Sequence, residues 1–123
     1  MLGKRVAATG GRLAALTGWG RTGASVARVV RPPDVPSVTA ALVGAGPRGA
    51  TARGLGRSYG DAAQNGGGLV LDATAINYVG PVDAQGRVVA AGGASLAALI
   101  APSIAAGWFL PVTPGTRHVT VGY

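Results

Sequence analysis

Three glycines, two arginines, a serine and a tyrosine are concentrated between Ala52 and Ala62 of this 123-residue chain. Glycine has no Cβ and tolerates positive φ, so a ligand can approach such a backbone closely. Successive amides in a loop of this kind form a concave nest that binds phosphate, and arginine adds charge-assisted hydrogen bonds. The spacing Gly54-x-Gly56-x-x-x-Gly60 differs by one residue from the dinucleotide fingerprint and lacks the Gly-Lys-Ser/Thr ending of a P-loop. The stretch therefore predicts a phosphate-binding loop of a different kind.

Ordinary structural roles are also open to the residues of this stretch. Its glycines could shape a tight surface turn without any ligand. Arg53 and Arg57 could be solvated or paired with Asp61 or Asp72, and Tyr59 could pack at the edge of the core. The residue types alone leave these roles open beside phosphate binding.

The other aromatic and titratable residues add little chemistry. Trp19 and Trp108 are of a type that more often anchors a core than contacts a cofactor. His118 is expected to be a polar loop residue, because nothing places a nucleophile or a carboxylate beside it. The chain has no cysteine, one histidine and four acidic residues. Neither disulfides nor a structural zinc site is therefore expected.

The net charge of +7 suggests a nucleic-acid partner, but its distribution does not favour one. Six basic residues precede the first acid, Asp34, and the later ones are scattered among predicted turns. The few aromatic residues do not form a base-stacking pattern. We therefore expect no nucleic-acid partner.

The chain end and the hydropathy bear on localisation. Residues 1–15 are basic and lack a continuous apolar segment, which predicts a flexible basic tail rather than a leader. No run approaches the roughly 20 apolar residues that span a bilayer. We expect a soluble or peripheral protein without a transmembrane segment, in the cytoplasm or associated with the cell envelope.

The elements that must position the glycine stretch indicate an α+β fold of the α/β-sandwich kind. A helix is expected over residues 36–45, with Asp34 or Ser37 capping its first turn. Short strands are expected over 50–53 and 68–72, so that one strand leads into the glycine stretch and the other follows it.

A hairpin is expected next. Residues 76–82 and 87–91 alternate in a way that predicts two antiparallel strands, joined by a loop over 83–86.

The last predicted element is a helix over residues 95–106. Ser95 is its candidate N-cap, and Gly107 stands at the C′ position. Pro102 interrupts the pattern and would cost about 3 kcal/mol in an unstrained interior. A kink or an early end near Ala101 is therefore predicted.

Four sequence blocks together resemble one family of flavoproteins. The blocks are Leu16-Thr-Gly-Trp-Gly-Arg-Thr22, Ala52-Arg-Gly-Leu-Gly-Arg-Ser-Tyr-Gly-Asp61, Gln64-Asn-Gly-Gly-Gly-Leu-Val70, and Pro114-Gly-Thr-Arg117 followed by Val119-Thr-Val-Gly122. In this order they are similar to the FAD-linked oxidases of the vanillyl-alcohol-oxidase type, which carry the PCMH-type FAD-binding domain. Within this family, the resemblance is to members that oxidise a polyprenyl-phosphoryl ribose for cell-wall arabinan synthesis.

This resemblance implies the N-terminal part of a PCMH-type FAD-binding domain over residues 16–123, with a short mixed sheet and flanking helices. FAD is the implied cofactor, bracketed by two loops, the first of which supplies backbone donors to the pyrophosphate. No residue is implied to be catalytic or to bind a metal. The implied cofactor-binding residues are Trp19, Ala52, Arg53, Gly54, Leu55, Gly56, Arg57, Ser58, Tyr59, Gly60, Asp61, Ala62, Gly115, Thr116, Thr120, Val121 and Gly122.

In this family the substrate domain and the catalytic residues belong to a part of the chain beyond Tyr123. The resemblance therefore implies an incomplete FAD-binding portion that is inactive and binds FAD weakly when alone. In the full-length enzyme, a hydride from a sugar CH–OH group would pass to FAD, and a reductase partner would act on the keto product. Two alternatives stay open: a small basic nucleic-acid-binding or interaction module, and a truncated gene product with no independent role.

Overall fold

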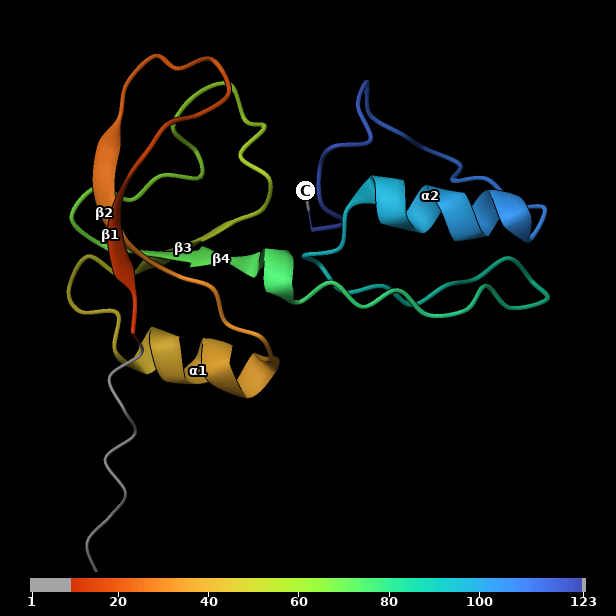
Figure 1. The fold of residues 1–123 in the computed structure, drawn as a ribbon, viewed down its shortest axis with the longest axis horizontal. Helices are drawn as coiled ribbons and strands as arrows, with labels where there is room; N and C mark the ends of the chain where they lie inside the picture. The colour runs from red at the N-terminus through yellow and green to blue at the C-terminus, as the bar shows by residue number, and fades with distance from the viewer. Residues whose placement is uncertain (1–9, 123) are drawn as a thin grey trace, which may run out of the picture.

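The computed structural model of the chain describes residues 10–122, which include a four-stranded sheet in the order β1-β2-β4-β3 (Figure 1). Strand β1 is antiparallel to β2, whereas β4 is parallel to both β2 and β3. This mixed sheet with its two helices confirms the expected α+β class. The elements are β1 (Arg12–Leu16), β2 (Ser25–Val30), α1 (Val35–Val43), β3 (Ala50–Arg53), β4 (Leu69–Asp72), the short 3₁₀ helix η1 (Ala73–Ala75) and α2 (Leu96–Ala105).

Strand β4 is the centre of the core. It has a hydrogen-bonded neighbour on each side, and its residues Leu69 and Val70 are fully buried. A strand buried on both faces needs a continuous apolar run, which Leu-Val-Leu provides. On one face, Leu69 and Val30 pack with Ala41 of α1. The predicted strands over 50–53 and 68–72 are confirmed to within one residue.

Helix α1 starts one residue earlier and ends two residues earlier than predicted. Asp34 is its N-cap, and the Asp34 carboxylate accepts a hydrogen bond of 2.8 Å from the amide of Ser37. Of the two predicted caps, Asp34 is therefore correct and Ser37 provides the donor. Gly44 ends the helix as its C-cap.

Helix α2 does not stop at Pro102, so the predicted early end near Ala101 is wrong, and the alternative of a kink there stays a prediction. The helix continues to Ala105, and Ser95 is its N-cap as predicted. Pro102 removes the amide that would bond to the carbonyl of Ala98, but both residues lie on the exposed side, where water can satisfy that carbonyl. In the next position, the Ser103 hydroxyl donates to the Leu99 carbonyl at 2.8 Å.

The predicted hairpin forms, but its two regular strands do not. Its arms share one isolated bridge, between Val79 and Ala90. Around this bridge the Gly80 amide donates to the Val89 carbonyl and the Ala91 amide donates to the Tyr78 carbonyl, both at 2.8 Å. Pro81 follows directly, and its ring fixes φ near about −65°, away from the extended value of a regular antiparallel strand, which is a physical reason for the correction. The loop itself is closed by Asp83, whose carboxylate accepts from the Arg87 guanidinium at 2.8 Å.

The N-terminal boundary of the domain also differs from the prediction. Residues 1–9 of the expected tail lie outside the described residues. Residues 12–15 of that tail belong to strand β1, which pairs with the unpredicted strand β2. Alanine and leucine dominate β1 and the segment is short, so its pattern is not distinctive of a strand.

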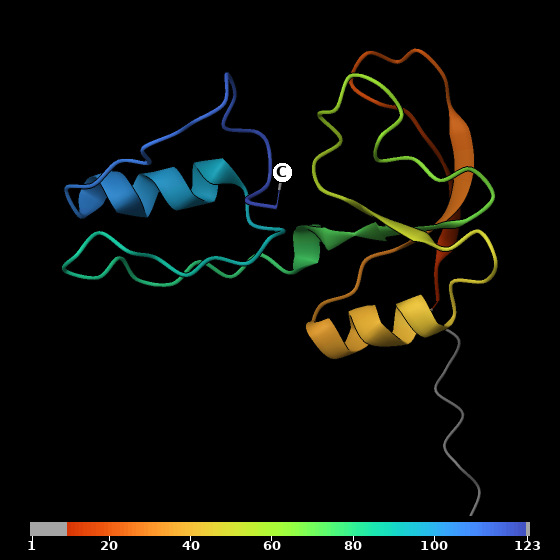
Figure 2. The same ribbon diagram turned by 180° about the vertical axis from the view of Figure 1, so that it is seen from behind.

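Helix α2 runs alongside the hairpin of residues 76–91, next to the sheet (Figures 1 and 2). Strand β4 and η1 lead directly from the sheet into this second part. Within residues 10–122, no helix has the length and apolar character needed to cross a membrane.

Candidate functional site

The glycine loop, residues 54–63, begins where strand β3 ends. In open sheets with parallel strands, ligands bind in the crevice beyond the carboxyl ends of the strands. Among the described residues, the main-chain amides of this loop find no protein acceptor. The carbonyl groups of Ser58, Tyr59 and Asp61, by contrast, all accept hydrogen bonds. The loop is thus anchored through its carbonyls, and its amides stay available as donors.

Arg53, the last residue of β3, is hydrogen-bonded to the end of the glycine loop and to the β1–β2 loop. Its guanidinium donates to the carbonyl of Thr17 at 2.8 Å and to that of Ala63 at 3.1 Å. Gly56 lies against the same group and has a φ of +68°, and a Cβ at Gly56 would lie 2.5 Å from Nη2 of Arg53. Arg53 is therefore a brace between the β1–β2 loop and the end of the glycine loop, and it pairs with neither candidate aspartate.

The Gly18-Trp19-Gly20 block packs directly against the glycine loop. The amide of Trp19 donates to the carbonyl of Ser58 at 2.7 Å, and that of Gly20 donates to the carbonyl of Tyr59 at 3.1 Å. Gly18 is buried, and a Cβ there would collide with the main chain of the loop. Close approach of two backbones thus explains the glycine at this position.

The second loop, residues 114–122, is held by the N-terminus of α2. The first amides of a helix have no intrahelical partner. Here the Leu96 amide donates to the carbonyl of Val119 at 2.9 Å, and the Ala97 amide donates to that of Arg117 at 3.1 Å. The capping bonds of α2 therefore also fix the position of this loop.

The two loops meet at Gly54 and Thr120. A cavity of about 230 Å³ lies between them, which we call the Thr120 cavity. Most of the residues that line it belong to the glycine loop, whose amides have no protein acceptor among the described residues, and none of them carries a carboxylate. This donor set fits the pyrophosphate of a dinucleotide. The residues lining it are Ala52, Gly54, Leu55, Gly56, Arg57, Ser58, Ala62, Ala63, Val119, Thr120 and Gly122.

A second cavity, of about 530 Å³, adjoins the Thr120 cavity and shares Arg57, Ser58 and Val119 with it, and we call it the Trp19 cavity. The guanidinium carbon of Arg57 lies 4.3 Å from the centroid of the Trp19 ring, which is a cation–π contact. Arg57 lines both cavities. The residues of the Trp19 cavity are Trp19, Arg57, Ser58, Tyr59, Pro114, Gly115, Thr116, His118 and Val119.

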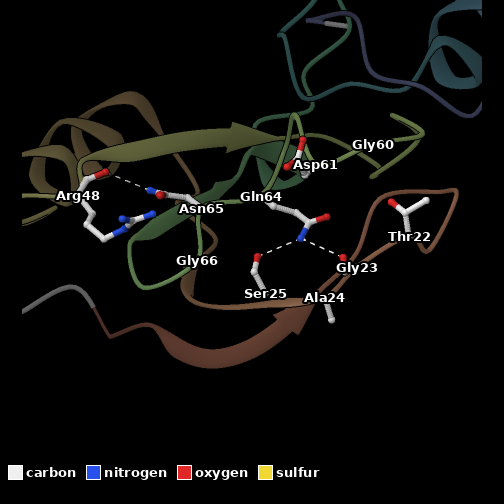
Figure 3. Close-up of a pocket in the computed structure, with 10 residues that line it drawn as sticks. All are labelled: Thr22, Gly23, Ala24, Ser25, Arg48, Gly60, Asp61, Gln64, Asn65 and Gly66. Atoms are coloured by element: carbon white, nitrogen blue, oxygen red, sulfur yellow. Dashed lines mark hydrogen bonds between the residues drawn. The ribbon is translucent and has the colours of Figure 1, made fainter.

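A third cavity, of about 600 Å³, lies where the glycine loop ends, and we call it the Gln64 cavity (Figure 3). The side-chain amide of Gln64 donates to the Ser25 hydroxyl at 3.0 Å, and that of Asn65 donates to the Leu69 carbonyl at 3.2 Å. These bonds tie the end of the loop to β2 and β4. The lining residues are Thr22, Gly23, Ala24, Ser25, Arg48, Gly60, Asp61, Gln64, Asn65 and Gly66.

Several arginines are bound to neighbouring groups rather than gathered into one basic face. Arg31 lies 3.8 Å from the carboxylate of Asp72, and Arg87 pairs with its hairpin partner. Arg28 donates to the carbonyl of Gly44 at 3.0 Å. This arrangement gives no support to the alternative of a nucleic-acid-binding module.

The structure divides the predicted cofactor-binding residues among these cavities. Arg53 and Val121 line none of the three, and Gly60 and Asp61 line the Gln64 cavity. Those in the Trp19 cavity are Trp19, Arg57, Ser58, Tyr59, Gly115 and Thr116. Those in the Thr120 cavity are Ala52, Gly54, Leu55, Gly56, Arg57, Ser58, Ala62, Thr120 and Gly122.

Several residues that build this region were not predicted from the sequence. The roles of Gln64 and Asn65 as anchors were not predicted, although two amides before a run of glycines are typical of an anchored turn. Val119 lines two cavities, and His118, which was expected to be an ordinary loop residue, lines the Trp19 cavity. No local pattern marks these two positions.

Comparison with known proteins identifies relatives of this architecture. The sequence model described as "FAD binding domain" matches residues 26–122. Over 111 residues, the chain is 49% identical to the decaprenylphosphoryl-beta-D-ribose oxidase of Mycolicibacterium smegmatis. The aligned region covers 87% of this chain and 24% of that relative, so the chain spans about a quarter of the relative's length.

Proposed function

This chain belongs to the family of FAD-binding domains, whose cofactor is FAD, and we propose that it supplies the pyrophosphate-binding part of the FAD site in a flavin-dependent oxidoreductase. The observation that carries this proposal is the glycine loop, whose amides find no acceptor among the described residues while its carbonyls are occupied. A pyrophosphate needs many donors that are already in place, and main-chain amides supply them without loss of side-chain entropy.

We assign the pyrophosphate to the Thr120 cavity. The amides of residues 54–58 would donate to it from one side, and the segment from Thr120 to Gly122 would close the other side. Arg53 would act through the loop that it braces. When bound, FAD supplies the capacity to accept a hydride, and this chain's residues bind and orient it.

The relative's name suggests the reaction of the complete enzyme. A decaprenylphosphoryl ribose oxidase acts on a phosphorylated sugar, so the proposed reaction is oxidation of a CH–OH group to a ketone. The hydroxyl loses its proton and the carbon transfers a hydride. The product would be a keto sugar, and a reductase that acts on this ketone is the proposed partner. The cell-wall arabinan pathway is the proposed setting.

The cofactor assignment can be tested with three ligands that differ in their phosphates. FAD contains the pyrophosphate, ADP contains it without the flavin, and riboflavin contains the flavin ring without any phosphate. We expect the purified chain to bind FAD weakly, with an affinity that flavin fluorescence and calorimetry at high FAD concentration can measure. ADP should compete with FAD, whereas riboflavin should bind at least about tenfold more weakly, because it lacks the charge-assisted hydrogen bonds. Equal affinity for riboflavin and FAD would contradict the assignment.

A further inference from the structure

Arg57 carries a charge that the protein itself does not neutralise. Its side chain is half-buried, and among the described residues it forms neither a hydrogen bond nor a salt bridge. Its guanidinium lies over the ring of Trp19 in a cation–π contact. Stacking on an indole fixes the plane of a guanidinium and leaves its N–H groups free to bind an anion in a forked geometry.

The Trp19 cavity around Arg57 is suited to an anion with an apolar part. No carboxylate lines it, whereas Trp19, Tyr59 and Pro114 provide apolar walls. On this side the carbonyls of Ser58 and Tyr59 are already bonded to the β1–β2 loop. Arg57 is the arginine among the residues that line this cavity, and the hydroxyls of Ser58, Tyr59 and Thr116 lie in the same lining as further donors to an anion.

We propose that the Trp19 cavity is a phosphate-ester subsite, in which Arg57, held by Trp19, binds the phosphate of a prenyl-phosphoryl sugar. This inference rests on the proposed function, because the phosphorylated sugar is taken from the proposed reaction. The phosphate would be distinct from the cofactor's pyrophosphate, which is assigned to the amides of the adjoining Thr120 cavity. Arg57 lines both cavities, so it places the substrate phosphate next to the cofactor.

The test uses the two tryptophans of the chain as reporters. The chain is labelled with ¹⁵N-tryptophan and titrated, with and without saturating FAD, with a geranylphosphoryl riboside and with the matching uncharged geranyl riboside. We expect the phosphorylated probe to shift the indole signal of Trp19 and not that of Trp108. The shift should persist when FAD is bound, and the uncharged probe should bind at least about tenfold more weakly.

Two arginine variants and a control complete the experiment. Arg57→Gln should weaken binding of the phosphorylated probe at least about tenfold while changing FAD affinity less than about threefold. Arg57→Lys should have an intermediate effect, since it keeps the charge and loses the fork. Arg12→Gln removes an exposed arginine at the start of β1, outside the three cavities, and it should change neither affinity. The unchanged Trp108 signal reports that each variant is folded.

Three results would overturn the inference. The first is displacement of the probe by FAD, and the second is an equal loss of FAD and probe affinity in Arg57→Gln. Both would assign Arg57 to the cofactor. The third is the absence of a Trp19 shift with and without FAD. The FAD titration without probe separately shows whether the cofactor proposal itself fails.

Discussion

Gly54 lies directly against Thr120, so that a Cβ at residue 54 would stand 2.6 Å from Oγ1 and 2.9 Å from Cγ2 of the threonine. This contact joins a loop of the sheet to a loop held by α2. The close approach of these two loops, which forms part of the wall of the Thr120 cavity, therefore requires a residue without a Cβ at position 54.

Gly54→Ala tests this contact. The added methyl group should force the two loops apart, destabilise the chain by about 1–3 kcal/mol and weaken FAD binding. Thr120→Ala in the same chain should recover most of both losses, because it removes the two closest atoms. A double-mutant cycle by urea unfolding measures this coupling. Independent, additive effects of the two substitutions would contradict the contact.

Arg53→Met tests the brace. Loss of the bonds to Thr17 and Ala63 leaves two carbonyls without a donor, so we expect a destabilisation of about 2 kcal/mol or more. FAD affinity should also fall because the loop is less ordered. If Arg53 acts only through the loop, the salt dependence of FAD binding between about 50 and about 300 mM stays as in the wild type. A flatter salt dependence would show instead that Arg53 contacts the phosphates.

Asp34→Asn tests the electrostatics of the α1 cap. Hydrogen bonds from the side chain and the amide of Ser37 lower the pKa of Asp34 below its ordinary value of 3.8. The unfolded chain therefore binds a proton more readily than the folded one, and the ionised cap contributes stability above about pH 4 that is lost as the pH falls through the folded-state pKa. Wild type should be more stable than Asp34→Asn at neutral pH, and the difference should shrink in acid. A difference in unfolding free energy that is constant with pH would contradict this role.

Pro102→Ala tests how α2 accommodates its proline. Alanine restores an amide that can donate to the carbonyl of Ala98, and Pro102 is exposed, so no packing is lost. We expect stabilisation of up to about 3 kcal/mol, with more helical signal in circular dichroism. The matched variant Ala101→Gly, also at an exposed helical position, should destabilise by about 1 kcal/mol. No gain in stability from Pro102→Ala would indicate that the helix is already strained around residue 102 for another reason.

Much of the fold followed from local patterns. Strand β4 was predicted because Leu69 and Val70 belong to a continuous apolar run between turn residues, and the cap of α1 because Asp34 precedes a proline at the helix start. Strand β1 was not predicted because it is stabilised by pairing with β2. Such pairing cannot be read from the residues of β1 alone. The early end at Pro102 was wrongly predicted because the free-energy cost of a proline inside a helix depends on its surroundings. The carbonyl that loses its donor, here that of the exposed residue Ala98, can be hydrated.

The sequence by itself determined the chemistry of the site: a glycine-rich loop, one arginine directly before it and one within it, and a second glycine-bearing loop. Only the tertiary structure decided what each arginine does. Arg53 points inward to two carbonyls from segments that are far apart in the chain, while Arg57 stacks on Trp19 between two cavities. These roles depend on which backbones approach each other in space, because a guanidinium binds whatever acceptor or ring the fold brings within its reach.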